Sequence, residues 1–123
     1  MCKSFSAGGS YYHKYNQTIS KMAYYIYITT NPNKTTLYIG MTNKLSLRLK
    51  QHQENKGDSE TFAGRYYCYN LIYYEAYKTA LEAIKREKEL KKWSRAKKES
   101  LINSVNPEWT FLNYLDDFRV GRI

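Results

Sequence analysis

The stretch that decides the fold is YYIYITTNPNKTTLYIG, which spans residues 24–40. Tyr24 to Thr30 are mostly β-branched or aromatic residues, a composition that favours a strand. Leu37 to Met41 form a second run of this kind, and the intervening Asn31 to Lys34 have the Asn and Pro residues that are typical of turns. Because the connection is short, the sequence predicts two antiparallel strands joined by a turn.

The alternation of side chains along these strands assigns residues to two faces. Ile26 and Ile39 are expected to point into the core, while Tyr27 and Tyr38 converge on the other face. Gly40 shares the face of Tyr38, and its missing side chain leaves room for a ligand to approach the backbone. Two interpretations remain open: an aromatic pair that packs under a helix, or two tyrosines directed at one chemical site.

Beyond this hairpin, the chain alternates helical and strand patterns. In chain order we predict a helix from about Leu45 to Asn55 capped by Thr42-Asn43, a loop at 55–65, a strand at 67–77, a helix from the Thr79 capping box to about Trp93, and a helix near Arg95 to Ser104. The order β-β-α-β-α-α indicates an α+β domain, in which helices pack on a small sheet. Trp109, Phe111 and Leu112 are expected to fold back onto the core.

The composition limits the function classes. The 123 residues suit one domain, which we place at 23–115, with an irregular or mobile extension at 1–22 and a tail at 116–123. The net charge of +9 favours nucleic acid first and an anionic membrane second as partner, but a lysine-rich solvated surface also explains it. No apolar run approaches the roughly 18 residues that span a bilayer. Because two lone cysteines, Cys2 and Cys68, suit a reducing cytosol, we expect a cytoplasmic protein.

Three polar residues fall on faces that the pattern otherwise assigns to the core. Arg48 and His52 lie one turn apart on the first predicted helix, on the side of Leu45 and Leu49. A guanidinium there needs an anion, and Arg suits phosphate, but Arg48 could also extend along the apolar stripe to solvent. Glu87 falls within the apolar stripe of the long helix, where a carboxylate needs a cation or a donor. A divalent metal and a salt bridge to Arg48 or a lysine both remain open.

The long helix and the segment after it are strongly basic. Residues 85–98 contain eight Lys or Arg against two Glu. Such a run can follow a phosphate backbone, or it can be an ordinary solvated helix face. The candidate nucleic-acid-binding residues are Lys44, Lys85, Lys88, Lys91, Lys92 and Arg95.

Together these motifs resemble one known family. The pattern Tyr25-Ile26-Tyr27, ten residues, Tyr38-Ile39-Gly40 resembles the paired motif that names the GIY-YIG nuclease superfamily. The resemblance continues through 40–52, 83–93 and 106–109, and the last two segments look like the small single-domain branch. It implies a three-stranded antiparallel sheet flanked by helices, and phosphodiester hydrolysis with one divalent metal. Tyr25 departs from the family, which has Gly at that position.

The resemblance also implies a role for each matching residue. These roles are Tyr38 as general base, directly or through water; Tyr27 in orienting the nucleophile or a phosphate oxygen; Arg48 in stabilising the pentacovalent phosphate; His52 near the nucleophile; Glu87 as ligand of one Mg²⁺ or Mn²⁺ ion; and Gly40 and Asn106 in support of the site.

From the motifs and the resemblance we predict a metal-dependent endonuclease, a hydrolase that acts on DNA. Structure specificity in repair or recombination is a narrower option that the sequence leaves open. Two alternatives remain open. One is a catalytically silent nucleic-acid-binding module whose tyrosines stack on bases or sugars. The other is an RNA-directed nuclease. The sequence does not indicate an oligomeric state.

Overall fold

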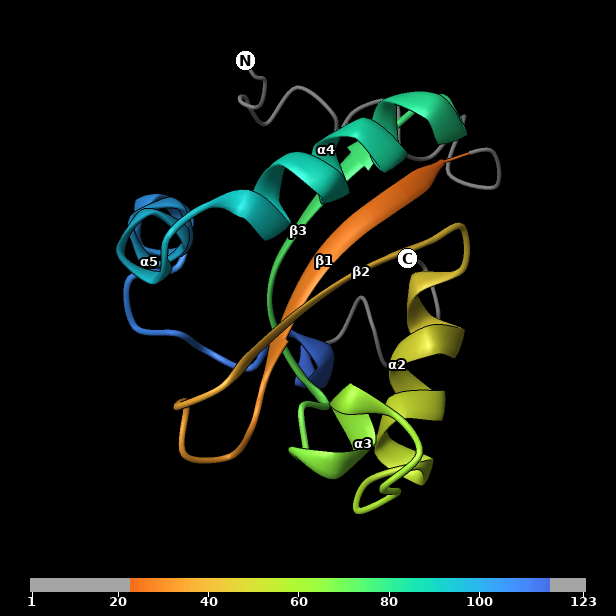
Figure 1. The fold of residues 1–123 in the computed structure, drawn as a ribbon, viewed down its shortest axis with the longest axis vertical. Helices are drawn as coiled ribbons and strands as arrows, with labels where there is room; N and C mark the ends of the chain where they lie inside the picture. The colour runs from red at the N-terminus through yellow and green to blue at the C-terminus, as the bar shows by residue number, and fades with distance from the viewer. Residues whose placement is uncertain (1–22, 116–123) are drawn as a thin grey trace.

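The computed structural model describes residues 23–115 (Figure 1). The extension expected at 1–22 and the tail expected at 116–123 lie outside the described residues. None of the helices in the described part of the chain is both long and apolar enough to cross a membrane.

A three-stranded antiparallel sheet forms the centre of the fold. Its strands are β1 (Tyr24–Thr30), β2 (Leu37–Thr42) and β3 (Asn70–Tyr77), and their spatial order is β2-β1-β3. The first two are the hairpin expected from the opening stretch, and β1 pairs with both of its neighbours. The predicted α+β class with a three-stranded antiparallel sheet is confirmed.

Helices surround this sheet. They are α2 (Leu45–Glu54), α3 (Phe62–Arg65), α4 (Ala80–Lys92), α5 (Arg95–Val105) and the 3₁₀ turn η2 (Leu112–Tyr114). Figure 1 shows α4 and α5 toward one side of the strands and α2 and α3 toward the other. The loop prediction for 55–65 missed α3, and β3 begins three residues later than expected.

The first residues of α4 and α2 show which of the predicted helix caps form. Thr79 caps α4 as expected, since its hydroxyl accepts a hydrogen bond from the Glu82 backbone N–H at 3.2 Å. The predicted Thr42-Asn43 cap of α2 is wrong. The cap position is Lys44, which makes no side-chain cap bond, and the Thr42 hydroxyl accepts from the Lys44 N–H at 3.0 Å. Thr42 therefore closes the turn that leads into α2.

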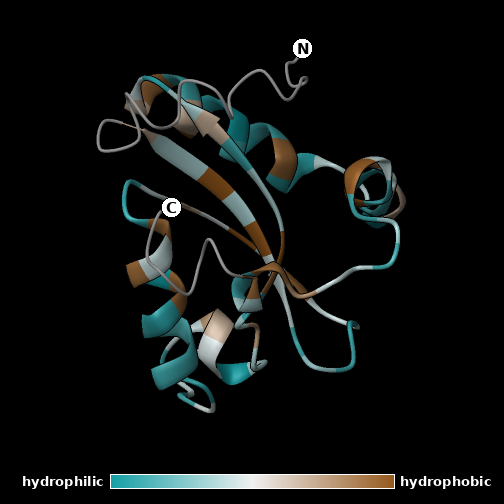
Figure 2. Cartoon of the chain, turned by 180° about the vertical axis from the view of Figure 1, so that it is seen from behind, coloured by the Kyte–Doolittle hydropathy of each residue, from teal (hydrophilic) through white to brown (hydrophobic). Residues whose placement is uncertain are grey.

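Each face of the sheet buries its own apolar cluster. The first cluster lies under α4 and α5 and consists of Ile26, Ile28, Ile39, Ile72, Tyr73, Ala83, Leu90 and Ile102. The second lies under α2 and consists of Ala23, Tyr25, Tyr27, Leu45, Leu49 and Leu71. Figure 2 shows the alternation that divides them as hydrophobic and more polar bands along β1. Trp109 and Phe111 pack against the first cluster and Leu112 against the second, so the chain after α5 returns to the core as expected.

Candidate active site

The strand register determines how Tyr27 and Gly40 meet. They are paired residues of β1 and β2, so their side-chain positions lie on the same face of the sheet. A Cβ atom at Gly40 would lie 2.5 Å from Cζ of Tyr27, far inside van der Waals contact. The sequence suggests that Gly40 leaves room for a ligand. In the structure, that room is taken by the phenol of Tyr27.

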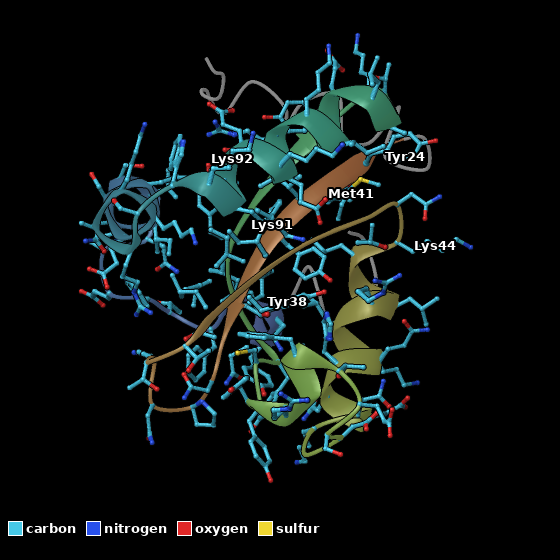
Figure 3. The ribbon with its side chains drawn as sticks, viewed as in Figure 1. Tyr24, Tyr38, Met41, Lys44, Lys91 and Lys92 are labelled. Atoms are coloured by element: carbon cyan, nitrogen blue, oxygen red, sulfur yellow. The ribbon has the colours of Figure 1, made fainter. Side chains whose placement is uncertain are left out.

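Tyr38 lies beside Tyr27 on this face but is more open to solvent. The two ring centroids are 6.2 Å apart. Tyr27 is fully buried, whereas Tyr38 is only partly buried. Figure 3 labels Tyr38 on β2, the strand at the edge of the sheet. Solvent or a ligand can therefore reach Tyr38 and not Tyr27.

The helix α2 brings His52 and Arg48 to the two tyrosines. Leu45 and Leu49 are buried against the sheet, and residues three or four positions away follow them onto the same side. His52 Nε2 lies 2.9 Å from the Tyr27 hydroxyl oxygen, and the His52 ring meets the Tyr38 ring edge-on at 5.4 Å. Four of the candidate residues from three elements thus form one cluster, which we call the tyrosine cluster: Tyr27, Tyr38, Arg48 and His52.

The electrostatics of this cluster leave Tyr27 and His52 uncharged at neutral pH. Burial, together with the nearby Tyr38, raises the pKa of Tyr27, although the Arg48 guanidinium acts in the opposite direction. Burial, and then the charge of Arg48, lowers the pKa of His52 to about 4. The neutral imidazole of His52 and the neutral phenol of Tyr27 are therefore joined by one hydrogen bond at 2.9 Å.

Arg48 is the cation of the tyrosine cluster, and no carboxylate balances it within the described residues. It is partly buried. The ion pairs found in the 23–115 range involve other residues: Glu75 with Arg86, Arg86 with Glu89, Glu87 with Lys91, and Arg95 with Glu99. A partly desolvated guanidinium without a carboxylate favours an external anion, and its planar donors match phosphate oxygens.

Glu87 lies on α4, between the buried residues Ala83 and Leu90. Its side chain is 22% exposed, and its carboxylate pairs with the exposed Lys91 at 3.4 Å. The sequence leaves a lysine salt bridge and a metal as alternatives, and the structure contains the lysine bridge. Among the interactions of residues 23–115, none joins Glu87 to the tyrosine cluster.

Glu87 nevertheless fits one kind of metal site. The described part of the chain contains no group of three or more His, Cys, Asp or Glu side chains that could enclose a metal ion. Mg²⁺ needs no such enclosure, because it is commonly held by one or two carboxylates together with water and substrate phosphate. A partly exposed carboxylate with one flexible lysine partner suits that arrangement.

Asn106 is buried at the end of α5 and ties the following segment to the sheet. Its amide group donates to the carbonyl oxygens of Ile72 at 2.9 Å and Thr110 at 3.0 Å. Its side-chain oxygen accepts from the Thr110 N–H at 3.0 Å. These contacts hold the framework between α5 and β3, and none of them reaches the tyrosine cluster.

The six basic candidates are all exposed. Lys44 precedes α2, four others lie on α4, and Arg95 opens α5. In Figure 3, Lys44 extends outward from the molecule, while Lys91 and Lys92 leave α4 in different directions. Arg95 has a carboxylate partner in Glu99 at 2.7 Å. The remaining amines on α4 provide a charged surface next to Glu87.

Two features escaped the sequence analysis. Glu75 is buried, and it accepts hydrogen bonds from Tyr73, Tyr77 and Arg86. The spacing of Tyr73, Glu75 and Tyr77 places them on one face of β3, so alternation alone could have signalled this network. The second is Phe62, whose ring stacks on Tyr38 with centroids 6.1 Å apart. No signal pointed to it within a segment that resembles a loop.

Comparison with known proteins agrees with the resemblance seen in the motifs. A family model described as the GIY-YIG catalytic domain matches residues 23–100, more than half of the chain. A UPF0213 protein of Bacillus velezensis is 41% identical over 88 residues, which cover 70% of this chain and 87% of that protein. A UPF0213 protein of Staphylococcus aureus is 37% identical over 67 residues, covering 54% and 79%. The solution NMR structure of a UPF0213 protein of Bacillus halodurans is 30% identical, with a TM-score of 0.47 over 77% of this chain and 98% of that one.

Proposed function

Because this chain belongs to the GIY-YIG family, we propose that it is a metal-dependent endonuclease that hydrolyses phosphodiester bonds in DNA. Nucleases of this family act on nucleic acid and generally use divalent metal ions. The chemistry of the tyrosine cluster supports the proposal, as do the net charge of +9 and the exposed lysines of α4.

The observation that carries the proposal is the placement of Arg48. This partly buried guanidinium has no carboxylate partner among the described residues, and it lies in a cluster with two tyrosines and a neutral histidine. Phosphoryl transfer depends on positioning and charge stabilisation more than on covalent chemistry by the protein. Arg48 meets the second requirement, because a phosphate undergoing attack gains negative charge that a fixed guanidinium stabilises.

The two tyrosines take different roles because they differ in exposure. We assign the general base to Tyr38, acting directly or through a water molecule, since it is the tyrosine that solvent reaches. Tyr27 stays protonated, because burial raises its pKa. Its hydroxyl is held by His52 and covered from solvent, so Tyr27 acts on the attacking water or a phosphate oxygen through His52 and not by direct contact. His52 in turn fixes the position of the Tyr27 hydroxyl.

We assign Glu87 to hold one Mg²⁺ or Mn²⁺ ion, with water and phosphate oxygens completing its coordination. When bound, such an ion supplies Lewis-acid stabilisation of charge on the phosphate. Glu87 pairs with Lys91 at 3.4 Å, and that single exposed contact can be exchanged for a metal at small cost. Gly40 and Asn106 support the site through the fold, by the packing of Tyr27 and by the anchoring of the segment after α5.

The positive surface of α4 suits a DNA backbone. Lys44, Lys85, Lys88, Lys91, Lys92 and Arg95 are the residues that we assign to phosphate contacts. A role on branched or flapped DNA in repair or recombination is the biological setting that we favour. A cytoplasmic location accords with Cys68, which is a buried free thiol.

A cleavage panel tests the metal-dependent function. Single-stranded, duplex, flapped and four-way DNA and single-stranded RNA would each be incubated with Mg²⁺ or Mn²⁺. We expect cleavage of at least one DNA substrate that disappears with a chelator. The Glu87→Gln variant should lose about 100-fold or more in rate at saturating DNA, because it removes the metal ligand.

The matched control for this panel is Glu89→Gln, which makes the same chemical change two residues away in an exposed ion pair with Arg86. We expect it to retain its rate within about twofold. Equal rates for Glu87→Gln and wild type would remove the metal role from Glu87. Salt-sensitive binding without cleavage of any substrate would favour the silent binding module, and cleavage of RNA alone would favour the RNA-directed nuclease.

A further inference from the structure

Two aromatic rings, Phe62 at the start of α3 and Tyr66 directly after its end, are exposed beside the tyrosine cluster. Phe62 is 50% exposed and Tyr66 is 43% exposed. Being four residues apart, they follow each other on one side of the chain, and their ring centroids are 4.7 Å apart. Phe62 also stacks on Tyr38, with centroids 6.1 Å apart and planes 25° from parallel. We call Phe62 and Tyr66 the aromatic pair.

The aromatic pair thus extends the candidate active site outward. His52 meets Tyr38 at 5.4 Å, Tyr38 meets Phe62, and Phe62 meets Tyr66. Each ring contacts the next, so the rings form a continuous row from the buried Tyr27 to the solvent. A ligand whose phosphate binds Arg48 would therefore have a ring surface available next to it.

Phe62 and Tyr66 face the solvent because the residues between them pack against the rest of the chain. Ala63 and Gly64, between Phe62 and Tyr66, are buried, and a Cβ atom at Gly64 would lie 2.6 Å from the Asn55 carbonyl oxygen. The Thr61 hydroxyl caps the turn by accepting from the Gly64 N–H at 2.9 Å. With its inner residues held in this way, α3 presents the aromatic pair on its outer side.

Charge decides which kind of partner suits these rings. The segment around these rings carries the cations Lys56 and Arg65 together with the acids Glu54, Asp58 and Glu60, so the attraction for phosphate comes from the +9 charge of the whole chain. A second copy of the chain would bring another net charge of +9, whereas a nucleic-acid strand brings negatively charged phosphate. Nucleobases stack on aromatic side chains with a gain of about 1–3 kcal/mol per base. Bases inside a duplex already have both faces covered, so only an unpaired base can use the rings.

We propose that Phe62 and Tyr66 form a stacking site for an unpaired nucleobase that adjoins the phosphate bound at Arg48. The inference rests on the proposed function for the identity of the ligand, and it specifies the substrate as a strand with at least one unpaired base at the cleavage position. A flap, a loop and a single strand meet that requirement.

Binding without cleavage tests this site. The wild-type chain and a Phe62→Ala/Tyr66→Ala double variant would be titrated, with EDTA present, into a fluorescein-labelled single-stranded 12-mer of dT and into a duplex of the same length, with anisotropy as readout. The double variant should lose about 10-fold or more in affinity for the single strand, the change expected for one or two lost stacking contacts, and less than about twofold for the duplex.

Three controls keep the outcome specific. Tyr66→Phe preserves the ring and should preserve single-strand affinity. Val105→Ala removes exposed apolar surface at the end of α5 and should change neither affinity. A 12-mer with abasic sites in place of its bases should bind wild type and the double variant equally. Circular dichroism would establish that the double variant remains folded.

Equal losses for single strand and duplex, or no loss for either, would overturn the stacking site. No loss for either would point instead to a protein partner for the aromatic pair. The two proposals can fail separately. If the double variant loses affinity for the single strand only, but the wild type cleaves no substrate, the stacking site is supported and the nuclease function is not. If the wild type cleaves DNA, but the double variant shows no selective loss of single-strand affinity, the nuclease function is supported and the stacking site is not.

Discussion

At the scale of single residues, Tyr27 and Gly40 depend on each other. The Tyr27 phenol covers Gly40 so closely that any Cβ at position 40 would displace the ring. Its hydroxyl also bonds to His52 at 2.9 Å, so a displaced ring would lose this partner. The small residue in the second strand therefore allows the tyrosine of the first strand to hold the histidine. This contact explains why the two strands need different residues at paired positions.

Tyr25 fits into the same packing, although the family resemblance leads to Gly at this position. Tyr25 is buried in the cluster under α2, and its ring meets Tyr74 edge-on at 6.1 Å. Burial raises its pKa. The ring therefore serves as core at one end of the sheet face, and none of the ring contacts among the described residues joins it to Tyr38.

The shifted titration of His52 predicts a specific pH dependence of stability. Its pKa in the folded state is about 4, against an ordinary value of 6.5. Because the unfolded chain binds the proton more readily, this contribution is complete above pH 6.5 and is lost as pH falls toward 4. We expect a loss of about 1–3 kcal/mol across that window.

Urea unfolding of wild type and His52→Gln at several pH values measures this effect. Carboxylates also titrate in this range, so the relevant quantity is the difference between the two proteins. Wild type should lose more free energy of unfolding than His52→Gln between pH 7 and pH 4. Parallel pH profiles would show that His52 titrates normally in the folded chain.

Much of the residue-scale arrangement could be predicted from sequence. Strand alternation placed Tyr27 and Tyr38 on one face, and helical spacing placed Arg48 and His52 on the side of the leucines. The reason for Gly40 could not be predicted, because it depends on which ring fills the space above a paired residue. Register and side-chain packing decide that, and neither can be read from local spacing.

At the scale of elements, a partly buried ion pair joins β3 to α4. Glu75 and Arg86 meet at 2.9 Å, with side-chain exposures of 9% and 21%. Burial alone would lower the pKa of Arg86, but its bonds to Glu75 outweigh burial and raise it. Tyr77 donates a further hydrogen bond to the Glu75 carboxylate at 2.6 Å. This network fixes the helix that carries Glu87 on the sheet.

Breaking the pair should destabilise the fold. In Glu75→Gln, Arg86 would lose its buried carboxylate, and we expect the free energy of unfolding to fall by about 2–4 kcal/mol. Glu99→Gln makes the same change in the exposed pair with Arg95, and it should cost less than about 1 kcal/mol. Urea denaturation at pH 7 measures both. If the two variants lose similar free energies of unfolding, burial does not make the Glu75–Arg86 pair more stabilising than the exposed pair.

The starts of α4, α3 and α2 show where a local sequence signal is enough to predict a helix. The Thr79 capping box marked the start of α4 because the signal is local and the hydroxyl does cap the helix. The single turn α3 could not be predicted, because it depends on the packing of Gly64 against the Asn55 and Asp58 carbonyls. The start of α2 at Leu45 was predicted, but its cap was not, because Thr42 bonds within the preceding turn.

At the scale of the whole molecule, the proposed site draws on both faces of the sheet. The tyrosine cluster lies on the face that α2 covers, while Glu87 belongs to α4, which packs on the other. The edge strand β2 carries Tyr38. The sequence motifs pointed to all of these residues, but they could not show that Glu87 pairs with Lys91.

This arrangement leads to a prediction about how the proposed site is completed. Arg48 lacks a carboxylate among the described residues, and Glu87 has a single lysine partner. A phosphate bound at Arg48 would supply the missing anion, and a divalent ion would take the place of Lys91 at Glu87. We therefore expect the cluster and the carboxylate to act as one site only when nucleic acid is present.

The measurement that tests the central claim most directly is the rate at which Tyr38→Phe cleaves, with Mg²⁺, a flapped DNA that carries unpaired bases. This change removes one oxygen atom and keeps the ring stacked on Phe62 and in edge-on contact with His52. Tyr24→Phe, at the start of β1 and packed against the opposite apolar cluster, is the matched control. We expect Tyr38→Phe to lose at least about 100-fold in rate, as for a lost general base, and Tyr24→Phe to equal wild type. A Tyr38→Phe rate within about threefold of wild type would contradict the assignment of catalysis to the tyrosine cluster.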